Sequence, residues 1–285
     1  MRFGAPLFDR WNGPDSWIKA LKQKGYNAAY CPVGMEASNA EVAEYAAAAG
    51  ENSIVIAEVG AWGNNPLHPD KAVAEAGFAG LVRSMMLAEK IGALCCVNVA
   101  GSRGECWDGH HPMNLSQETF DRIVACVNRL LDEVMPVRTA FTLEMMPWMF
   151  PTTAREMLSL VQAVGRPGFA AHVDLVNITC SPRLYYENAE KTQECFALLG
   201  PLVKSVHAKD IRLGEGLTVH LDEARPGLGG FDYRVFLSSV RNHCPEAPVM
   251  LEHLPTAEEY DLAAAYVRGV ADELGIPMPA AEVIV

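Results

Sequence analysis

Short apolar, β-favouring segments alternate with amphipathic helical segments along the whole chain, and this alternation restricts the fold more than any other sequence feature. Four of the apolar segments end in the residues Glu144, Asp174, His207 and Glu252. These residues are 30, 33 and 45 positions apart, about one strand–helix unit each. A strand–helix repeat of this kind predicts a parallel sheet covered by helices.

The pattern predicts eight strands and eight helices. The strands are expected at 2–5, 27–31, 53–58, 94–99, 139–144, 169–174, 202–207 and 248–252. The helices are expected at about 14–22, 39–49, 70–91, 116–135, 153–164, 188–199, 233–240 and 256–274. Several of the strands are almost continuously apolar, as expected of a sheet covered on both faces.

The length and composition fit one domain. A chain of 285 residues is ordinary for an α/β barrel, and no linker rich in Pro, Gly or Ser divides it. We therefore predict an α/β fold, a single (β/α)8 TIM barrel over residues 1–285. A doubly wound open sheet is the rival fold, but the glycine fingerprint G-x-G-x-x-G and a P-loop are both absent.

The residues that end the strands matter because such barrels carry their active sites at the carboxyl ends of the strands. In chain order these residues are Ala5, Cys31, Glu58, Val99, Glu144, Asp174, His207 and Glu252. Three carboxylates at one barrel mouth would repel each other unless a cation or shared protons compensated. Three oxygen ligands and one imidazole predict a divalent metal, Mn²⁺ first, with Mg²⁺, Co²⁺ or Zn²⁺ as alternatives.

Charge and cysteine usage restrict the partners and the compartment. The formal net charge of −12 disfavours DNA or RNA binding, because an acidic surface repels a phosphate backbone. The eight cysteines include no C-x-x-C pair, and no run approaches the ~20 apolar residues of a membrane span. With no signal-peptide pattern at the start, a reduced, cytoplasmic protein without a membrane partner is the expectation.

The strand-end set resembles the xylose-isomerase-like barrel superfamily, specifically its sugar (phosphate) isomerase/epimerase branch. The resemblance rests on Glu144 in Thr-Leu-Glu, Asp174 in His-Val-Asp, His207 in His-Ala-Lys-Asp and Glu252 in Leu-Glu-His, and it spans nearly the whole chain. The turn Pro-Gly-Leu-Gly that ends at Gly229 is also similar to that branch.

The resemblance implies that Glu144, Asp174, His207 and Glu252 bind the metal and that the two glutamates exchange protons with a ketose or keto-polyol. It thus implies an isomerase or epimerase that works through an enediolate, and a homo-oligomer, since homodimers and tetramers are common among such relatives. A cation that chelates a carbonyl and its neighbouring hydroxyl makes the α-proton removable, which agrees with this chemistry.

Two departures keep a second enzyme class open. Ketose epimerases of this superfamily usually have a His three residues after the aspartate, where this chain has Asn177. The pair Lys209-Asp210 is more similar to the inosose dehydratases. A metal-dependent dehydratase, or a lyase acting on 3-oxo-glycosides, is therefore the alternative. A non-catalytic sugar-binding barrel is a third hypothesis, against which the complete acid set argues.

Further residues are candidates for substrate contacts. Lys209 should point towards the mouth and is a candidate catalytic residue, or else it pairs with an acid. Each of the others has a structural alternative, such as a surface salt bridge for Arg183, a helix cap for Glu58 or a lid for a loop Trp. The expected substrate-binding residues are Glu58, Trp107, Trp148, Asn177, Arg183 and Arg212.

Overall fold

The computed structural model describes residues 1–279, and its main sheet has eight parallel strands. The strands are β1 (Phe3–Gly4), β2 (Ala28–Tyr30), β3 (Val55–Gly60), β4 (Cys95–Asn98), β5 (Ala140–Leu143), β6 (Phe169–Val173), β7 (Val203–Ala208) and β10 (Val249–Leu251). Their order in the sheet is β1-β10-β7-β6-β5-β4-β3-β2. The predicted (β/α)8 barrel is confirmed; the last six residues of the predicted 1–285 domain lie outside the described part.

The two end strands of this sheet approach each other, so the barrel is nearly closed. The backbone N–H of Asn27 donates to the carbonyl of Phe3, and its side-chain Oδ1 accepts from the N–H of Phe3. On the other side, the Tyr30 hydroxyl donates to the carbonyl of Leu251 in β10. These bonds join β2 to β1 and β10 without a full ladder.

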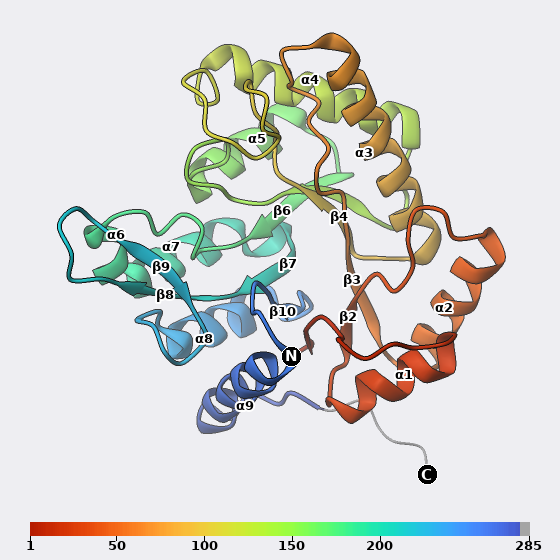
Figure 1. Cartoon of the computed structure of the whole chain (residues 1–285), viewed down its shortest axis with the longest axis vertical. Helices are drawn as coiled ribbons and strands as arrows, with labels where there is room; N and C mark the ends of the chain where they lie inside the picture. Colours follow the sequence, from red (N-terminus) through yellow and green to blue (C-terminus); the bar gives the residue numbers. More distant parts are fainter. Residues whose placement is uncertain (280–285) are drawn as a thin grey trace.

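Helices surround the strands, as Figure 1 shows. They are α1 (Pro14–Gln23), α2 (Asn39–Glu51), α3 (Lys71–Ile91), α4 (Gln117–Val134), α5 (Ala154–Val164), α6 (Pro182–Tyr186), α7 (Asn188–Leu199), α8 (Tyr233–His243) and α9 (Ala257–Glu273), with one turn of 3₁₀ helix at Gly200–Leu202. Apart from the short α6, each lies within a few residues of a predicted helix. None of the described helices is long and apolar enough to cross a membrane.

The ends of the helices follow from local chemistry. Ser116, Thr153 and Thr256 cap α4, α5 and α9, because each side-chain oxygen accepts the backbone N–H three residues ahead. Gly92 and Gly165 end α3 and α5 with positive φ angles of 78° and 63°, a conformation that glycine adopts without strain.

One region expected to be a loop is ordered differently. The segment after β7 forms an antiparallel hairpin of β8 (Asp210–Leu213) and β9 (Leu221–Ala224), which lies at the left edge of the view in Figure 1. The carboxylate of Asp210 accepts hydrogen bonds from the backbone N–H groups of Ile211, Gly227, Gly229 and Phe231. This carboxylate therefore fixes the segment that follows the hairpin.

Candidate metal centre

Four side chains from four consecutive strands of the barrel meet at its carboxyl end. Glu144 and Asp174 directly follow β5 and β6, His207 lies in β7, and Glu252 directly follows β10. One ligand atom from each side chain lies within 4.8 Å of the others. The structure thus brings together the four residues that the sequence singled out as metal ligands.

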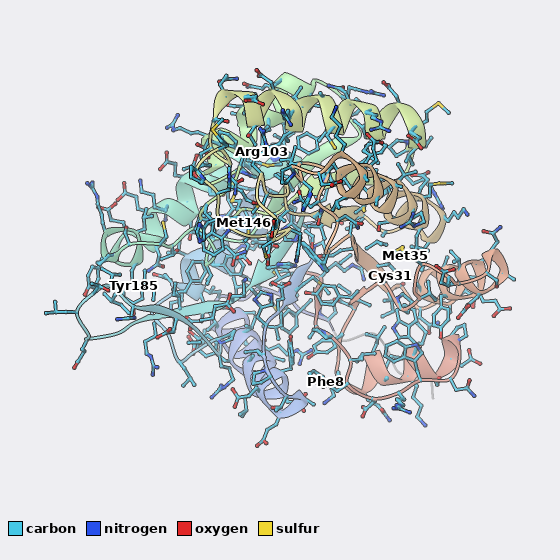
Figure 2. The ribbon with its side chains drawn as sticks, turned by 45° about the horizontal axis from the view of Figure 1, so that its top comes forward. Phe8, Cys31, Met35, Arg103, Met146 and Tyr185 are labelled. Carbon is cyan, nitrogen blue, oxygen red and sulfur yellow. The ribbon has the colours of Figure 1, made fainter. Side chains whose placement is uncertain are left out.

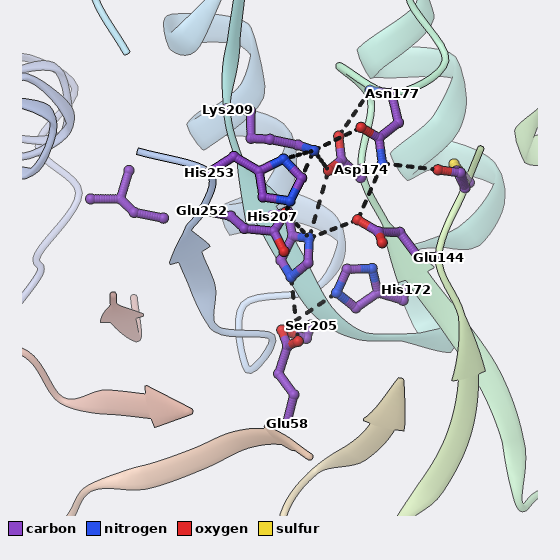
Figure 3. A network of polar contacts seen from close by, with 12 residues as sticks. Glu58, Glu144, His172, Asp174, Asn177, Ser205, His207, Lys209, Glu252 and His253 are labelled. Atoms are coloured by element: carbon purple, nitrogen blue, oxygen red, sulfur yellow. Dashed lines mark hydrogen bonds and ion pairs between the residues drawn. The ribbon is translucent and has the colours of Figure 1, made fainter. Parts of the chain in front are cut away.

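The His207 imidazole is the centre of this group, as the close-up in Figure 3 shows. Its Nδ1 lies 2.9 Å from Glu144 Oε1, 2.9 Å from Glu252 Oε2 and 3.6 Å from Asp174 Oδ2. Burial alone would lower the pKa of His207, but the carboxylates around the ring, Glu252 first, raise it well above its ordinary value. Without a metal, a protonated imidazole is the cation that the three acids share.

The oxygens of this group suit a divalent metal ion. Lys209 Nζ lies 2.8 Å from Asp174 Oδ2 and His207 Nδ1 lies 2.9 Å from Glu252 Oε2. Neither contact has hydrogen-bond geometry, so both carboxylate oxygens are buried without a hydrogen bond. The charges of Lys209 and His207 balance these two oxygens without a directed hydrogen bond, and a divalent ion would bind such oxygens directly. The donor set of three carboxylates and one imidazole fits such an ion.

The two glutamates differ in acidity. Burial raises the pKa of Glu144, and the neighbouring His207 does not fully offset this effect. Burial would also raise the pKa of Glu252, but His207 and Lys209 outweigh it and lower the value. Two carboxyl groups whose pKa values are pushed apart can serve as an acid and a base at one pH.

Lys209 is held inside the site, with 2% of its side chain exposed. Its ammonium donates to Asn177 Oδ1 at 2.7 Å and to Glu223 Oε1 at 3.1 Å. Burial would lower the pKa of Lys209, but Asp174 and Glu252 raise it above its ordinary value, so the side chain stays charged. Lys209 therefore pairs with acids at the centre itself.

Asn177, one of the expected substrate contacts, lies beside Glu144. Its Nδ2 donates to Glu144 Oε1 at 3.2 Å, and its backbone N–H donates to Asp174 Oδ1 at 3.0 Å. Asn177 thus links two of the candidate ligands to Lys209.

Two residues of the site were missed in the sequence. Glu223 comes from β9, and His253 follows Glu252 with a positive φ of 58°, which is uncommon for a non-glycine residue. His253 Nδ1 lies 3.1 Å from Glu223 Oε2 and 3.3 Å from Lys209 Nζ. The position of His253 directly after Glu252 was a usable signal, whereas nothing in the sequence marked the segment of Glu223 as a strand.

Glu58 requires a correction. Strand β3 continues to Gly60, two residues beyond the predicted end, so Glu58 lies inside the barrel with 1% of its surface exposed. It accepts a hydrogen bond from the Ser205 hydroxyl, and its oxygens lie 3.3 Å from His207 Nε2 and 3.4 Å from His172 Nε2. A contact between Glu58 and a sugar hydroxyl is incompatible with this burial.

The two arginines expected at the substrate also lie elsewhere. The side chain of Arg183 is 83% exposed on α6 and pairs with Glu187 one turn along. Arg212 is exposed on β8, where it lies opposite Asp222. Each was expected at the mouth because it follows a strand that ends there, Arg183 after the sixth and Arg212 after the seventh, but Arg183 lies on a short helix and Arg212 on a hairpin, and both side chains are exposed.

A cavity of about 890 Å³ is lined by two of the four candidate ligands, Glu144 and Glu252. Asn177 adds a further polar group to the lining, and the expected Trp107 and Trp148 add aromatic rings. Trp62 lines it as well, with its ring centroid 6.5 Å from that of Trp107. The Trp148 indole N–H donates to the carbonyl of Asp108, which fixes this ring at the wall. Polar groups beside flat apolar rings suit a sugar or sugar derivative.

Comparisons with known proteins agree with the fold. A model of the xylose isomerase-like TIM barrel family matches residues 18–270. Similar solved structures include endonuclease IV from Thermus thermophilus, with a TM-score of 0.73, 16% identity and coverage of 96% of this chain and 100% of that one. D-psicose 3-epimerase with D-tagatose from Clostridium cellulolyticum has a TM-score of 0.67 and 12% identity, covering 98% of this chain and 100% of that one.

A third structure, a xylose isomerase-like TIM barrel protein from Mycobacterium smegmatis in complex with magnesium, has a TM-score of 0.64 and 16% identity over 96% of both chains. At these identities the likeness to solved structures establishes the fold alone. No curated protein sequence matches the chain.

Proposed function

The protein belongs to the xylose isomerase-like TIM barrel family, and on that premise we propose that it is a divalent-metal-dependent isomerase or epimerase of a ketose or keto-polyol. The observation that carries the proposal is the meeting of Glu144, Asp174, His207 and Glu252 beside a cavity with aromatic walls. Structures of sugar epimerases are among those with the same fold.

The four residues would hold the metal, with Mn²⁺ as the first candidate and Mg²⁺, Co²⁺ or Zn²⁺ as alternatives. When bound, such an ion would polarise the carbonyl of the substrate and so acidify the neighbouring C–H.

The chain's own residues perform the proton transfer. Glu252, whose pKa is lowered, is the base that takes the proton next to the carbonyl, and Glu144, whose pKa is raised, holds the proton that is returned. The two carboxyl groups enter the site from β10 and β5, on different sides of the His207 ring. Lys209 and Asn177 orient these acids, and Asn177 also lines the cavity that would take the substrate.

The test is proton exchange between a ketose and deuterated water in the presence of Mn²⁺. We expect Glu144→Gln and Glu252→Gln each to lower the exchange rate by roughly 10²–10⁴-fold, the usual contribution of a positioned acid or base. Glu190→Gln, which changes an exposed carboxylate on α7, is the matched control and should keep full activity. Full exchange in both site variants would exclude the two glutamates as the proton carriers.

A metal-dependent dehydratase or lyase is the second candidate, and the charged, buried Lys209 favours it. A fixed cation beside the proposed base would stabilise the negative charge that develops on a group leaving from the β-carbon. Mass spectrometry of products from keto sugars and 3-oxo-glycosides separates the two functions. Unchanged mass supports isomerisation, whereas loss of water or of the aglycone supports elimination.

A further inference from the structure

A second cavity shares the lining residue Glu252 with the main cavity. It has a volume of about 300 Å³ and is formed by the segments around β1, α1 and β2. Most of its lining is apolar or aromatic, including Leu7, Trp11 and Trp17. Figure 2 labels Cys31, which lines this cavity, on the N-terminal side of the molecule, and Met146 of the main cavity nearer its middle.

The hydroxyl and thiol groups of this second cavity are already engaged. The Tyr30 hydroxyl donates to the carbonyl of Leu251, and the Cys31 thiol donates to the carbonyl of Val33. Among its described lining residues, Glu252 is the one side chain with a charge at neutral pH. Such a cavity offers an occupant contact area rather than hydrogen bonds, so it selects an apolar group.

Glu252 lines both cavities, so one molecule that contacts Glu252 can have parts in each. The polar groups that suit a sugar, including Asn177, Glu223 and His253, all line the main cavity. A molecule with its sugar ring there and a substituent directed past Glu252 would place that substituent in the second cavity.

We propose that the second cavity is a subsite for the aromatic aglycone of a glycoside. The inference rests on the proposed function, because it takes Glu252 to be the group that faces the reacting sugar. It narrows the substrate class to keto sugars, such as 3-oxo-glycosides, in which the carbonyl is separate from the glycosidic carbon that carries the apolar aglycone.

The experiment measures binding, so it does not depend on turnover. Phenyl β-D-glucopyranoside and methyl β-D-glucopyranoside are titrated calorimetrically into the Mn²⁺-loaded protein. We expect a dissociation constant at least about tenfold lower for the phenyl glucoside, since burial of a ring removes much apolar area from water. Equal constants, or no binding of either compound, would overturn the subsite.

Substitutions that fill the second cavity give a second test of the phenyl preference. Leu7 is half-buried in the loop after β1, so Leu7→Trp fills the cavity from its rim, and Leu7→Phe does so more mildly. We expect Leu7→Trp to abolish the phenyl preference, Leu7→Phe to reduce it, and the matched change Leu262→Trp on the exposed face of α9 to leave it intact. A phenyl preference that survives both Leu7 substitutions would refute the proposal.

The two proposals fail in different ways. Absence of proton exchange with every keto sugar removes the catalytic function, whereas a measured phenyl preference would still stand. Exchange on free ketoses without a phenyl preference keeps the catalytic function and removes the subsite.

Discussion

The two ring nitrogens of His207 face different carboxylates, three on one side of the ring and a single one on the other. Nδ1 faces Glu144, Asp174 and Glu252, whereas Nε2 lies 3.3 Å from Glu58. A proton on Nε2 directed at Glu58 leaves Nδ1 free to bind a metal, the usual arrangement for a ligating histidine with a carboxylate behind it. Glu58 is therefore a positioning residue for the candidate metal centre.

Glu58→Gln should weaken metal binding without unfolding the barrel. We expect the Mn²⁺ dissociation constant to rise by roughly 10–100-fold, the usual effect of removing such a supporting group. Ser205→Ala removes only the hydroxyl that donates to Glu58 and should have a smaller effect. Calorimetric titration with Mn²⁺ measures both, and an unchanged constant in Glu58→Gln would show that Glu58 does not position the imidazole.

The pKa of His253 tests whether Glu223, which the hairpin carries, contacts the site in solution. The hydrogen bond with Glu223 raises the pKa of His253 above its ordinary value, and this effect outweighs burial. Glu223→Gln should therefore lower the pKa of His253, which an NMR titration of its ring protons measures. A pKa that does not move would mean that Glu223 and His253 are not paired in solution.

At the scale of the elements, Asp210 and the turn at 226–229 form one unit. The sequence marked both motifs separately, but only the structure shows that the Asp210 carboxylate holds the turn through the N–H groups of Gly227 and Gly229. At Gly229, an added Cβ would lie 2.4 Å from the carbonyl oxygen of Ile211 and 2.2 Å from Asp210 Oδ1. Glycine is required here because the backbone of β8 passes too close for a side chain.

Gly229→Ala should consequently destabilise the protein and displace the hairpin that carries Glu223. We expect a loss of about 1–3 kcal/mol in the free energy of unfolding, as for other overpacked sites, measured by denaturant titration. Gly269→Ala in α9 is the matched control, since an added Cβ meets nothing within 4 Å there. That change should be neutral or stabilising by up to about 1 kcal/mol. Equal effects of the two substitutions would contradict the close approach at Gly229.

Some elements could be predicted from local sequence and others could not. The helix at Asn188–Leu199 was predicted with the observed bounds, because its apolar spacing and the following glycine are local signals. The end of β3 was misplaced because Val59-Gly60 resembles a loop start, and two residues of strand decide whether Glu58 faces the mouth or the interior. The segments of β8 and β9 are largely polar, and their pairing depends on contacts such as those of Asp210 that sequence periodicity does not contain.

For the whole molecule, the charge balance of the site predicts how stability depends on pH and metal. Burial would raise the pKa of Glu58, but its contacts with His207 and His172 outweigh burial and lower the value. Burial would likewise raise the pKa of Asp174, but Lys209 and His207 outweigh it and lower the value. Their contribution is present above about pH 4 and is lost as the pH falls through their folded-state values. The raised pKa of His207 contributes stability that is complete below about pH 6.5 and is lost as the pH rises through its folded-state value.

The metal-free protein should therefore have its highest melting temperature between about pH 4 and pH 6.5, where both contributions are present. A metal must displace the proton of His207, so Mn²⁺ should raise the melting temperature more at about pH 8 than at about pH 6. One fixed Mn²⁺ concentration is used at both pH values; set at 100 times the dissociation constant at about pH 8, it stabilises by about 2.7 kcal/mol there, which corresponds to several degrees for a chain of this size. Differential scanning calorimetry with EDTA and with Mn²⁺ at both pH values measures the gain. Equal gains at both values would mean that His207 does not carry the exchanged proton, and no gain at either would remove the metal centre itself.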